Sequence, residues 1–216
     1  MAEITLIRHA QASFGEADYD RLSKLGHEQS KTLGDYLSTQ SRTYDRVVLG
    51  TMRRHFQTAT STGLNEPFEA HQGFNEYDFG DLLACRYPDG MPEEVGHDRR
   101  GHFRILRDTI GLWQNNKIDG VAETYEDFQN RTRAAMNMAC RDGAKTVAVV
   151  TSGGPIGQIV ADTLGAPPSQ MIALNLQVKN TSISRMVYNV NNRFLHEFNA
   201  TPHLDAPAHI HKLTYS

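Results

Sequence analysis

The stretch ITLIRHAQASF, residues 4–14, places an arginine and a histidine directly after a short apolar run. The run ends at Ile7 and predicts a buried strand, because strands covered on both faces read as continuous apolar segments. Arg8 and His9 follow the point where this strand stops. Ligands of open α/β sheets bind beyond the carboxyl ends of the strands, so the pair is a candidate for a binding site.

Farther along the chain, apolar runs alternate with helical patterns. DRVVLG, residues 45–50, predicts a second short buried strand, followed by a helix that begins at Thr51. KTVAVVTSGGPIGQIVADTLG, residues 145–165, predicts a strand, a glycine turn and a helix. Residues 181–190 and 193–200 predict a hairpin. This alternation indicates an α/β fold, a three-layer sandwich with a mostly parallel central sheet.

Two of the predicted helices carry a start signal. Ser23 can cap a helix that extends to about Leu37, and Thr124 can cap another with Asp127 near its third position. Residues 80–122 differ in character, since a loop rich in proline, glycine and charge precedes a short helical pattern. We expect them to form an insertion or lid within a single domain, residues 1–216.

Composition excludes several classes of function. The 216 residues carry a formal net charge of −3, which gives no broad basic field for nucleic acid or an anionic membrane. The two cysteines form no disulfide framework and no metal-ligand spacing, as expected of free thiols in a reducing compartment. We find no signal peptide and no apolar run long enough for a membrane span, so we expect a cytoplasmic protein.

Three strand ends can deliver their side chains to one crevice. They would bring Arg8 and His9, Arg54, and the glycine-rich helix start that contains Ser152 and Gly153. Two guanidiniums and free N–H groups at a helix N-terminus describe an anion site, most naturally for phosphate. A neutral imidazole within such a site can attack phosphorus and carry the phosphoryl group covalently.

Segments in the same order resemble the motifs of the histidine phosphatase superfamily, the phosphoglycerate mutase-like proteins. LIRHAQAS resembles the Arg-His-Gly signature, and LSKLGHEQSKTLGDYL resembles the first helix. RRHFQTA resembles the Arg-Ala-x-Gln-Thr-Ala helix, and FNEYDFGD resembles the Asn-Glu-x-x-Phe-Gly loop. AETYEDFQNR resembles the Gly-Glu-Ser helix start, and NTSISRMVYN the late strand. The resemblance runs nearly end to end and implies the phosphoglycerate mutase-like fold.

The resemblance also implies roles for individual residues. His9 would accept the phosphoryl group, while Arg8 and Arg54 would clamp the phosphate. Glu76 would protonate the leaving alcohol and then assist the water that hydrolyses the phosphohistidine. Flanking aromatic side chains can raise the pKa of Glu76 by desolvation. No metal or other cofactor is implied, because the arginines neutralise the charge of the transferred group.

This chain departs from the family pattern at positions close to the predicted site residues. Ser152 stands where the second histidine of the family follows its strand, and Ala10 replaces the signature glycine. Gly15 stands where many members have asparagine, and Gly50 where serine is usual. Replacing a protonated histidine by a neutral serine removes a charged donor, a loss that typically costs on the order of 10²–10³ in rate. We therefore expect a divergent member with reduced activity.

Some alternatives stay open from the sequence. Ser152 could be a nucleophile, although Val150 breaks the Gly-x-Ser-x-Gly pattern, or simply a helix cap. Arg53 could replace Arg54 as phosphate ligand, and Asp78 could replace Glu76 as acid. Two histidine pairs, at positions 97 and 102 and at 209 and 211, lack further metal ligands.

Two classes of function fit these residues. The first is a metal-independent phosphatase that acts on a phosphorylated small molecule or a phosphoprotein, and the second is a non-catalytic phospholigand sensor. A phosphoglycerate mutase is a weaker candidate, since nothing indicates a pocket that retains a bisphosphate. The arginines of residues 99–107 form either a solvated face or a selector for acidic substrates. The assembly state stays open, with a homodimer as one candidate.

Overall fold

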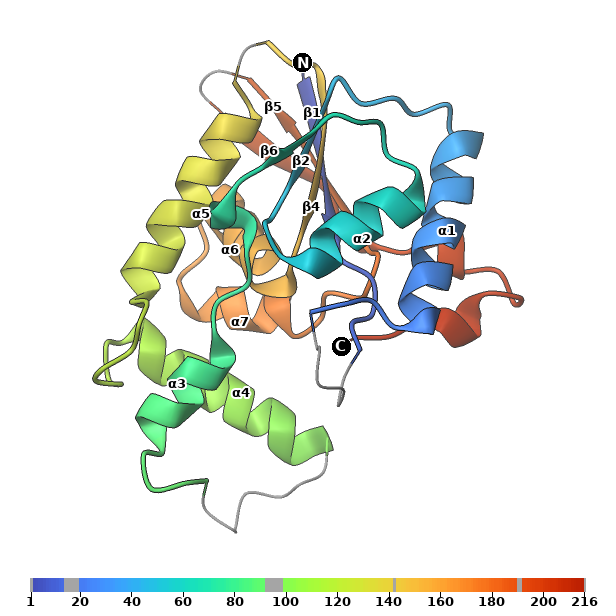
Figure 1. The fold of residues 1–216 in the computed structure, drawn as a ribbon. Helices are drawn as coiled ribbons and strands as arrows, with labels where there is room; N and C mark the ends of the chain where they lie inside the picture. The colour runs from blue at the N-terminus through green and yellow to red at the C-terminus, as the bar shows by residue number, and fades with distance from the viewer. Residues whose placement is uncertain (1, 14–19, 92–98, 142, 190–191, 216) are drawn as a thin grey trace.

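The described residues of the computed structural model form one six-stranded sheet, in the order β3-β2-β4-β1-β5-β6 (Figure 1). The structure describes residues 2–13, 20–91, 99–141, 143–189 and 192–215, without the side chains of residues 99, 100 and 102. Strands β1 to β4 are parallel, and β5 is antiparallel to β1 and to β6. The strands are β1 Ala2–Arg8, β2 Arg46–Leu49, β3 Phe68–Ala70, β4 Thr146–Thr151, β5 Ile183–Tyr188 and β6 Arg193–Ala200.

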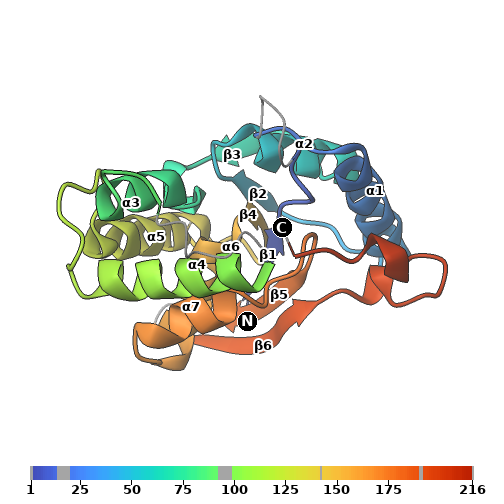
Figure 2. The same cartoon turned by 90° about the horizontal axis from the view of Figure 1, so that it is seen from below.

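Helices cover both faces of this sheet, which confirms the three-layer sandwich with a mostly parallel centre (Figures 1 and 2). Ile4 and Leu6 of β1 point into a core cluster shared with α5 and α6, whereas Ile7 points into a cluster shared with α1 and α2. This alternation follows the two-residue period of a strand. The helices are α1 Lys24–Thr39, α2 Arg53–Thr62, α3 Phe79–Arg86, α4 Arg99–Gln114, α5 Tyr125–Ala139, α6 Gly153–Leu164 and α7 Ser169–Asn175.

Side-chain caps fix the start of two helices where the sequence predicts them. The Ser23 hydroxyl accepts a hydrogen bond from the Gly26 N–H at 3.0 Å, at the start of α1. Thr124 and Asp127 form the predicted capping box of α5. The helix expected at Thr51 begins instead at Arg53. Thr51 is held outside it because its N–H and hydroxyl bond to the Asn75 side chain at 2.6 and 2.7 Å.

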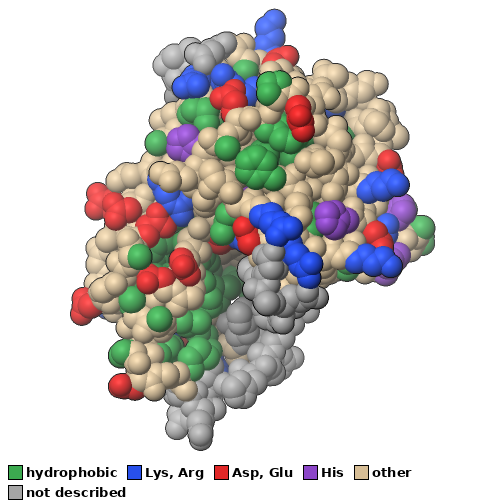
Figure 3. Space-filling view, viewed as in Figure 1, with side chains coloured by type: hydrophobic (Ala, Val, Ile, Leu, Met, Phe, Trp, Pro, Cys, Tyr) green, Lys and Arg blue, Asp and Glu red, His purple; other side chains and the backbone are tan. Residues whose placement is uncertain are grey.

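Residues 80–122 are joined to the main body by aromatic packing. Trp113 of α4 lies against Tyr77 and Phe128, with ring centroids 5.3 and 5.5 Å apart. The Trp113 indole N–H also donates to the Glu123 carbonyl at 2.8 Å. Hydrophobic side chains gather over the α3–α4 lobe on the face drawn in Figure 3. The carboxyl-terminal half of α4 therefore belongs to the core around Tyr77 and Phe128, while the role of residues 80–122 as a lid stays a prediction.

The last described residues return to the carboxyl edge of the sheet (Figures 1 and 2). The side chain of Gln29 on α1 donates to the Lys212 carbonyl at 2.6 Å and to the Thr214 hydroxyl at 2.8 Å. The Asn180 N–H donates to the Thr214 carbonyl at 2.9 Å. Within the described part of the chain, no helix is long and apolar enough to cross a membrane.

Candidate phosphate site

The parallel strands end level with one another, which brings the predicted residues together. Arg8 at the end of β1 is in register with Thr151 at the end of β4, and Leu49 of β2 is in register with Val150. The residues that follow these ends, His9, Gly50 and Ser152, consequently lie at one edge of the sheet.

Hydrogen bonds hold both the backbone N–H and the backbone carbonyl of His9. Its N–H donates to the Thr151 carbonyl at 2.8 Å, and its carbonyl accepts from the Asn180 side chain at 3.1 Å. The ring Nδ1 lies 2.7 Å from the Ala10 carbonyl oxygen. A carbonyl only accepts hydrogen bonds, so Nδ1 carries the proton of the neutral ring. The lone pair of the imidazole is therefore on Nε2.

The surroundings keep this imidazole neutral. His9 is 4% exposed, and burial lowers its pKa well below the ordinary value. The charges of Arg54 and then Arg8 lower the pKa of His9 further, since a cation disfavours a second cation nearby. His9 is consequently a free base, with a nucleophilic nitrogen, at neutral pH.

The two guanidiniums are both anchored. Arg54 is 4% exposed, and its Nη1 forms an ion pair with Asp20 at 2.7 Å. Arg8 Nη1 donates to the Tyr215 carbonyl at 2.9 Å and also to the Val178 carbonyl. Each arginine thus has a fixed orientation, as a phosphate clamp requires.

The alternative ligand Arg53 is exposed, in contrast to the buried Arg54 beside it. Its backbone N–H donates to the Asp20 carboxylate at 2.7 Å. Arg54 acts on the pKa values of both His9 and Glu76, which places its charge among the candidate groups.

Glu76 faces the start of α6. Both of its carboxylate oxygens lie 3.1 Å from the Gly154 nitrogen, which donates to them. Burial raises the pKa of Glu76, against the opposing effects of the Gly154 N–H, Arg54 and Arg8. Phe74 and Tyr77, two of the flanking aromatic residues, are buried. A carboxyl group with a raised pKa beside cations can give and take a proton.

Asp78 is placed differently from Glu76. It is exposed, and its side chain caps α3 by accepting from the Asp81 N–H at 3.0 Å. The structure therefore gives Asp78 a structural task at the start of a helix, while Glu76 faces the glycine turn.

The glycine turn differs from the expected open anion cradle. The Gly154 N–H is directed at Glu76, and the Gly153 backbone lies beside the Arg8 guanidinium, with 3.7 Å between the Arg8 Cζ and a Cβ built on Gly153. Ser152 stands at the N-cap of α6, but its side chain makes no capping bond. The interpretation of Ser152 as a simple helix cap is therefore wrong for its hydroxyl.

The Ser152 hydroxyl lies 2.8 Å from Nε2 of His55, a residue that the sequence motifs do not single out. His55 is completely buried on α2, and its ring centroid is 5.7 Å from that of His9. Helical spacing is the signal in the sequence that indicates a buried position 55, since this position lies on the same face of α2 as the buried residues Ala59 and Thr62. The site thus contains a second imidazole.

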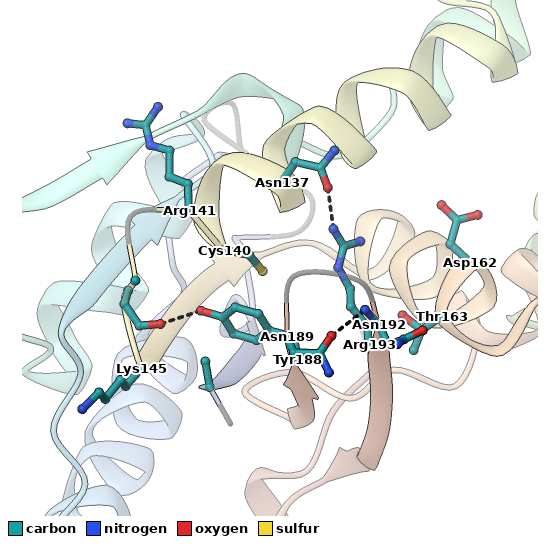
Figure 4. Close-up of a pocket in the computed structure, with 13 residues that line it drawn as sticks. Asn137, Cys140, Arg141, Lys145, Asp162, Thr163, Tyr188, Asn189, Asn192 and Arg193 are labelled. Carbon is teal, nitrogen blue, oxygen red and sulfur yellow. Dashed lines mark hydrogen bonds between the residues drawn. The ribbon is translucent and has the colours of Figure 1, made fainter.

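Two surface depressions lie among the described residues near these strands. One, of about 1030 Å³, is lined by Ala2, Cys140, Lys145 and Tyr188 (Figure 4). Ala2 begins β1 and Lys145 directly precedes β4, so this depression is a strand length away from His9. The other, of about 400 Å³, lies between residues 11–13 and 21–24, beside the segment that follows His9.

Within the described part of the chain, no three His, Cys, Asp or Glu side chains cluster as a metal site would need. His209 and His211 belong to that part, whereas the side chains at positions 97 and 102 lie outside it, as does Gly15. Both cysteines, Cys85 and Cys140, are free thiols.

A neutral imidazole near two guanidiniums, at the carboxyl edge of an α/β sheet, is typical of a phosphoryl-transfer site. The sequence model of the histidine phosphatase superfamily (branch 1) matches residues 4–201. The chain belongs to this superfamily. No curated protein sequence gives a significant match.

Solved structures of phosphatases share the fold. A mutant phosphoserine phosphatase from Entamoeba histolytica, in complex with phosphoserine, superposes with a TM-score of 0.67 at 18% identity, over 94% of this chain and 100% of that one. The α-ribazole phosphatase from Shigella flexneri superposes with a TM-score of 0.64 at 18% identity, over 92% of this chain and 96% of that one. A mycobacterial glucosyl-3-phosphoglycerate phosphatase superposes with a TM-score of 0.64 at 18% identity, over 93% of this chain and 100% of that one. At such identities the similarity concerns the fold.

Proposed function

We propose that this protein is a metal-independent phosphomonoester hydrolase that works through a phosphohistidine at His9. The observation that carries the proposal is the state of the His9 ring. Nδ1 donates to the Ala10 carbonyl at 2.7 Å, which leaves the lone pair on Nε2, and burial with two nearby guanidiniums keeps the ring neutral. A histidine that serves only the fold would not need cationic neighbours that suppress its protonation.

In the first step, His9 Nε2 attacks the phosphorus of the ester. The P–N bond forms as the P–O bond to the leaving alcohol breaks, and Glu76 gives its proton to the alcohol oxygen. Arg8 and Arg54 balance the charge on the phosphoryl oxygens, which is where this reaction needs stabilisation. The raised pKa of Glu76 increases the fraction of the protonated form that this step requires.

In the second step, water attacks the phosphohistidine. Glu76, now a carboxylate, accepts a proton from the water, and the P–N bond breaks to return His9 to its neutral form. Inorganic phosphate leaves, and Glu76 is again protonated for the next ester. One carboxyl group thus serves both steps in opposite directions.

We propose a small phosphate ester as the substrate, in preference to a phosphoprotein. The neighbours in fold are a phosphoserine phosphatase, an α-ribazole phosphatase and a glucosyl-3-phosphoglycerate phosphatase, whose names all refer to small molecules.

A turnover screen tests the proposal. Phosphate release is measured with p-nitrophenyl phosphate, a panel of small phosphate esters and a phosphoserine peptide, with and without a chelator. We expect turnover of at least one small ester, insensitivity to chelator, and a loss of at least about 10³-fold in His9→Ala. His27→Ala, at an exposed histidine of α1, is the matched control and should keep full activity.

Two results would contradict the proposal. Activity that survives in His9→Ala would place the reaction elsewhere. Tight binding of inorganic phosphate without turnover of any ester would indicate the phospholigand sensor instead.

A further inference from the structure

A second buried imidazole accompanies the candidate nucleophile. His55 lies on α2 directly after Arg54, and its ring is tilted by 44° from that of His9, with centroids 5.7 Å apart. Both His55 and Ser152 are 0% exposed, and His55 Nε2 lies 2.8 Å from the Ser152 hydroxyl. A buried polar pair therefore joins α2 to the start of α6 in the site.

This pair is not required by either helix. Burying an imidazole and a hydroxyl is unfavourable unless each finds a hydrogen-bond partner. The Ser152 side chain stands at an N-cap but makes no capping bond, so its hydroxyl serves His55 rather than α6. An apolar residue at position 55 and a capping serine at 152 would satisfy the fold without this contact.

The glycine at position 50 leaves the space that the His55 ring occupies. A Cβ built on Gly50 would lie only 2.2 Å from Nδ1 of His55 and 2.9 Å from the Asn75 side-chain oxygen. Any larger residue at position 50 would displace His55. Gly50, His55 and Ser152 stand where the family pattern has serine, alanine and histidine, so three departures meet in one place.

We propose that His55 and Ser152 together replace the second histidine of the family. Ser152 donates its hydroxyl hydrogen to an oxygen of the transferred phosphoryl group, and His55 is the positioning residue that holds this hydroxyl in place. The inference rests on the proposed function, because the phosphoryl group is the one that His9 accepts. No bond to either residue forms or breaks.

The charge state of His55 suits this role. Burial, with the charge of Arg54 second, lowers the pKa of His55 to about 3, against a smaller opposite effect of the Gly50 backbone. The ring is therefore neutral and has one N–H. The Gly50 backbone carbonyl is the competing acceptor for this hydrogen, at Nδ1. We place the hydrogen on Nε2, where the ring donates to the Ser152 oxygen and leaves the hydroxyl hydrogen free to point at the phosphoryl oxygen.

Substitutions at position 55 test the hydrogen bond apart from the packing. His55→Leu fills the space without a donor, and we expect kcat to fall by about 10²–10³-fold, as for the loss of one preorganised donor. His55→Gln can present an amide N–H to the Ser152 oxygen, so it should recover at least about tenfold over the leucine variant. A purely structural role would not separate these two variants.

An exchange of the two residues is the sharper test. Ser152→His alone should lower activity, because its imidazole would compete with His55 for one buried space. The double variant His55→Ala/Ser152→His recreates the family arrangement, and we expect it to recover to within about tenfold of the native kcat. Independent sites would give additive losses instead. Thr132→Ala, which removes an equally buried hydroxyl on α5 away from the site, is the matched control and should keep its activity.

Vanadate binding gives a readout that does not depend on turnover. As a mimic of the five-coordinate transition state, vanadate should bind the His55→Leu variant more weakly by about the same factor as the loss in kcat. Suppose that the native protein binds vanadate, that His55→Leu binds it more weakly, and that no ester is hydrolysed. The proposed function is then wrong, while the proposed role of His55 and Ser152 is supported. If the native protein hydrolyses esters and His55→Leu changes neither kcat nor vanadate affinity, the proposed role of His55 and Ser152 is wrong, while the proposed function is supported. An acid-stable phosphate on Ser152 would also overturn the inference, since His55 would then serve a serine nucleophile.

Discussion

At the scale of single residues, the candidate site sets its protonation states by burial and by charge. Burial and two guanidiniums lower the pKa of His9, whereas burial raises the pKa of Glu76 despite the same guanidiniums. The ordinary pKa of histidine, about 6.5, lies above that of glutamic acid, about 4.3, and here the two pKa values move in opposite directions. The surroundings therefore move the two pKa values toward a state in which His9 is free base while Glu76 keeps a proton.

We expect an acidic pH optimum with two assignable limbs. The acid limb of kcat/KM reports protonation of His9 and lies below pH 6.5, because its pKa is lowered. The alkaline limb reports loss of the Glu76 proton. Glu76→Gln should lower kcat/KM by about 10²–10⁴-fold for an alkyl phosphate, and far less for p-nitrophenyl phosphate, whose leaving group needs no proton.

Asp78→Asn is the control for this prediction, because Asp78 is exposed and its side chain caps α3. It should keep the native profile and lose only a little stability. An equal loss in Glu76→Gln for both leaving groups, or the larger loss in Asp78→Asn, would contradict the assignment of the acid.

At the scale of elements, local signals in the sequence predict the structure where local chemistry decides it. Ser23 and the Thr124–Asp127 box mark helix starts because capping involves residues close in sequence. The short strand β3, Phe68–Ala70, has no such signal, since its three residues gain their place by pairing with β2. Helix α2 begins at Arg53 and not at Thr51, because Thr51 is bonded to Asn75, a residue 24 positions farther along the chain.

The same distinction applies to the site. His9, Arg8, Arg54 and Glu76 could be chosen from motifs, because each stands in a recognisable stretch next to a strand or helix end. The contact of His55 with Ser152 joins residues 97 positions apart. Nothing local indicates that contact, so the second imidazole becomes visible only in the folded chain.

At the scale of the whole molecule, three buried histidines couple the fold to pH. His9, His55 and His203 are each at most 5% exposed, and burial is the first cause of the lowered pKa of each. The pKa values of His55 and His203 fall to about 3 and about 4. Between these folded values and pH 6.5, His55 and His203 take up protons when the protein unfolds and not while it is folded.

Stability should therefore decrease as the pH falls below 6.5. In that range the unfolded chain binds more protons than the folded one, and each histidine contributes up to about 1.4 kcal/mol per pH unit. The stability is fully present above pH 6.5 and is lost toward the folded pKa values. Glu76, whose pKa is raised, acts in the opposite direction and reduces the slope.

Urea unfolding at pH 7, 6 and 5 measures this dependence. His203→Gln should flatten the slope between pH 6 and 5 by about 1 kcal/mol per pH unit. A free energy of unfolding that is constant from pH 7 to 5 would contradict the proposed neutral, buried state of these rings.

The central claim is that His9 carries the phosphoryl group, and trapping this intermediate tests it most directly. Glu76→Gln protein is mixed with p-nitrophenyl phosphate, quenched in alkali, and digested for mass spectrometry under conditions that preserve phosphohistidine. Hydrolysis of the intermediate should be slow in this variant, because water loses its base. We predict up to one phosphate per chain, on His9, that is lost in acid and absent from His9→Ala. Phosphate found on Ser152, or turnover with no labelled His9 at any time, would contradict the account.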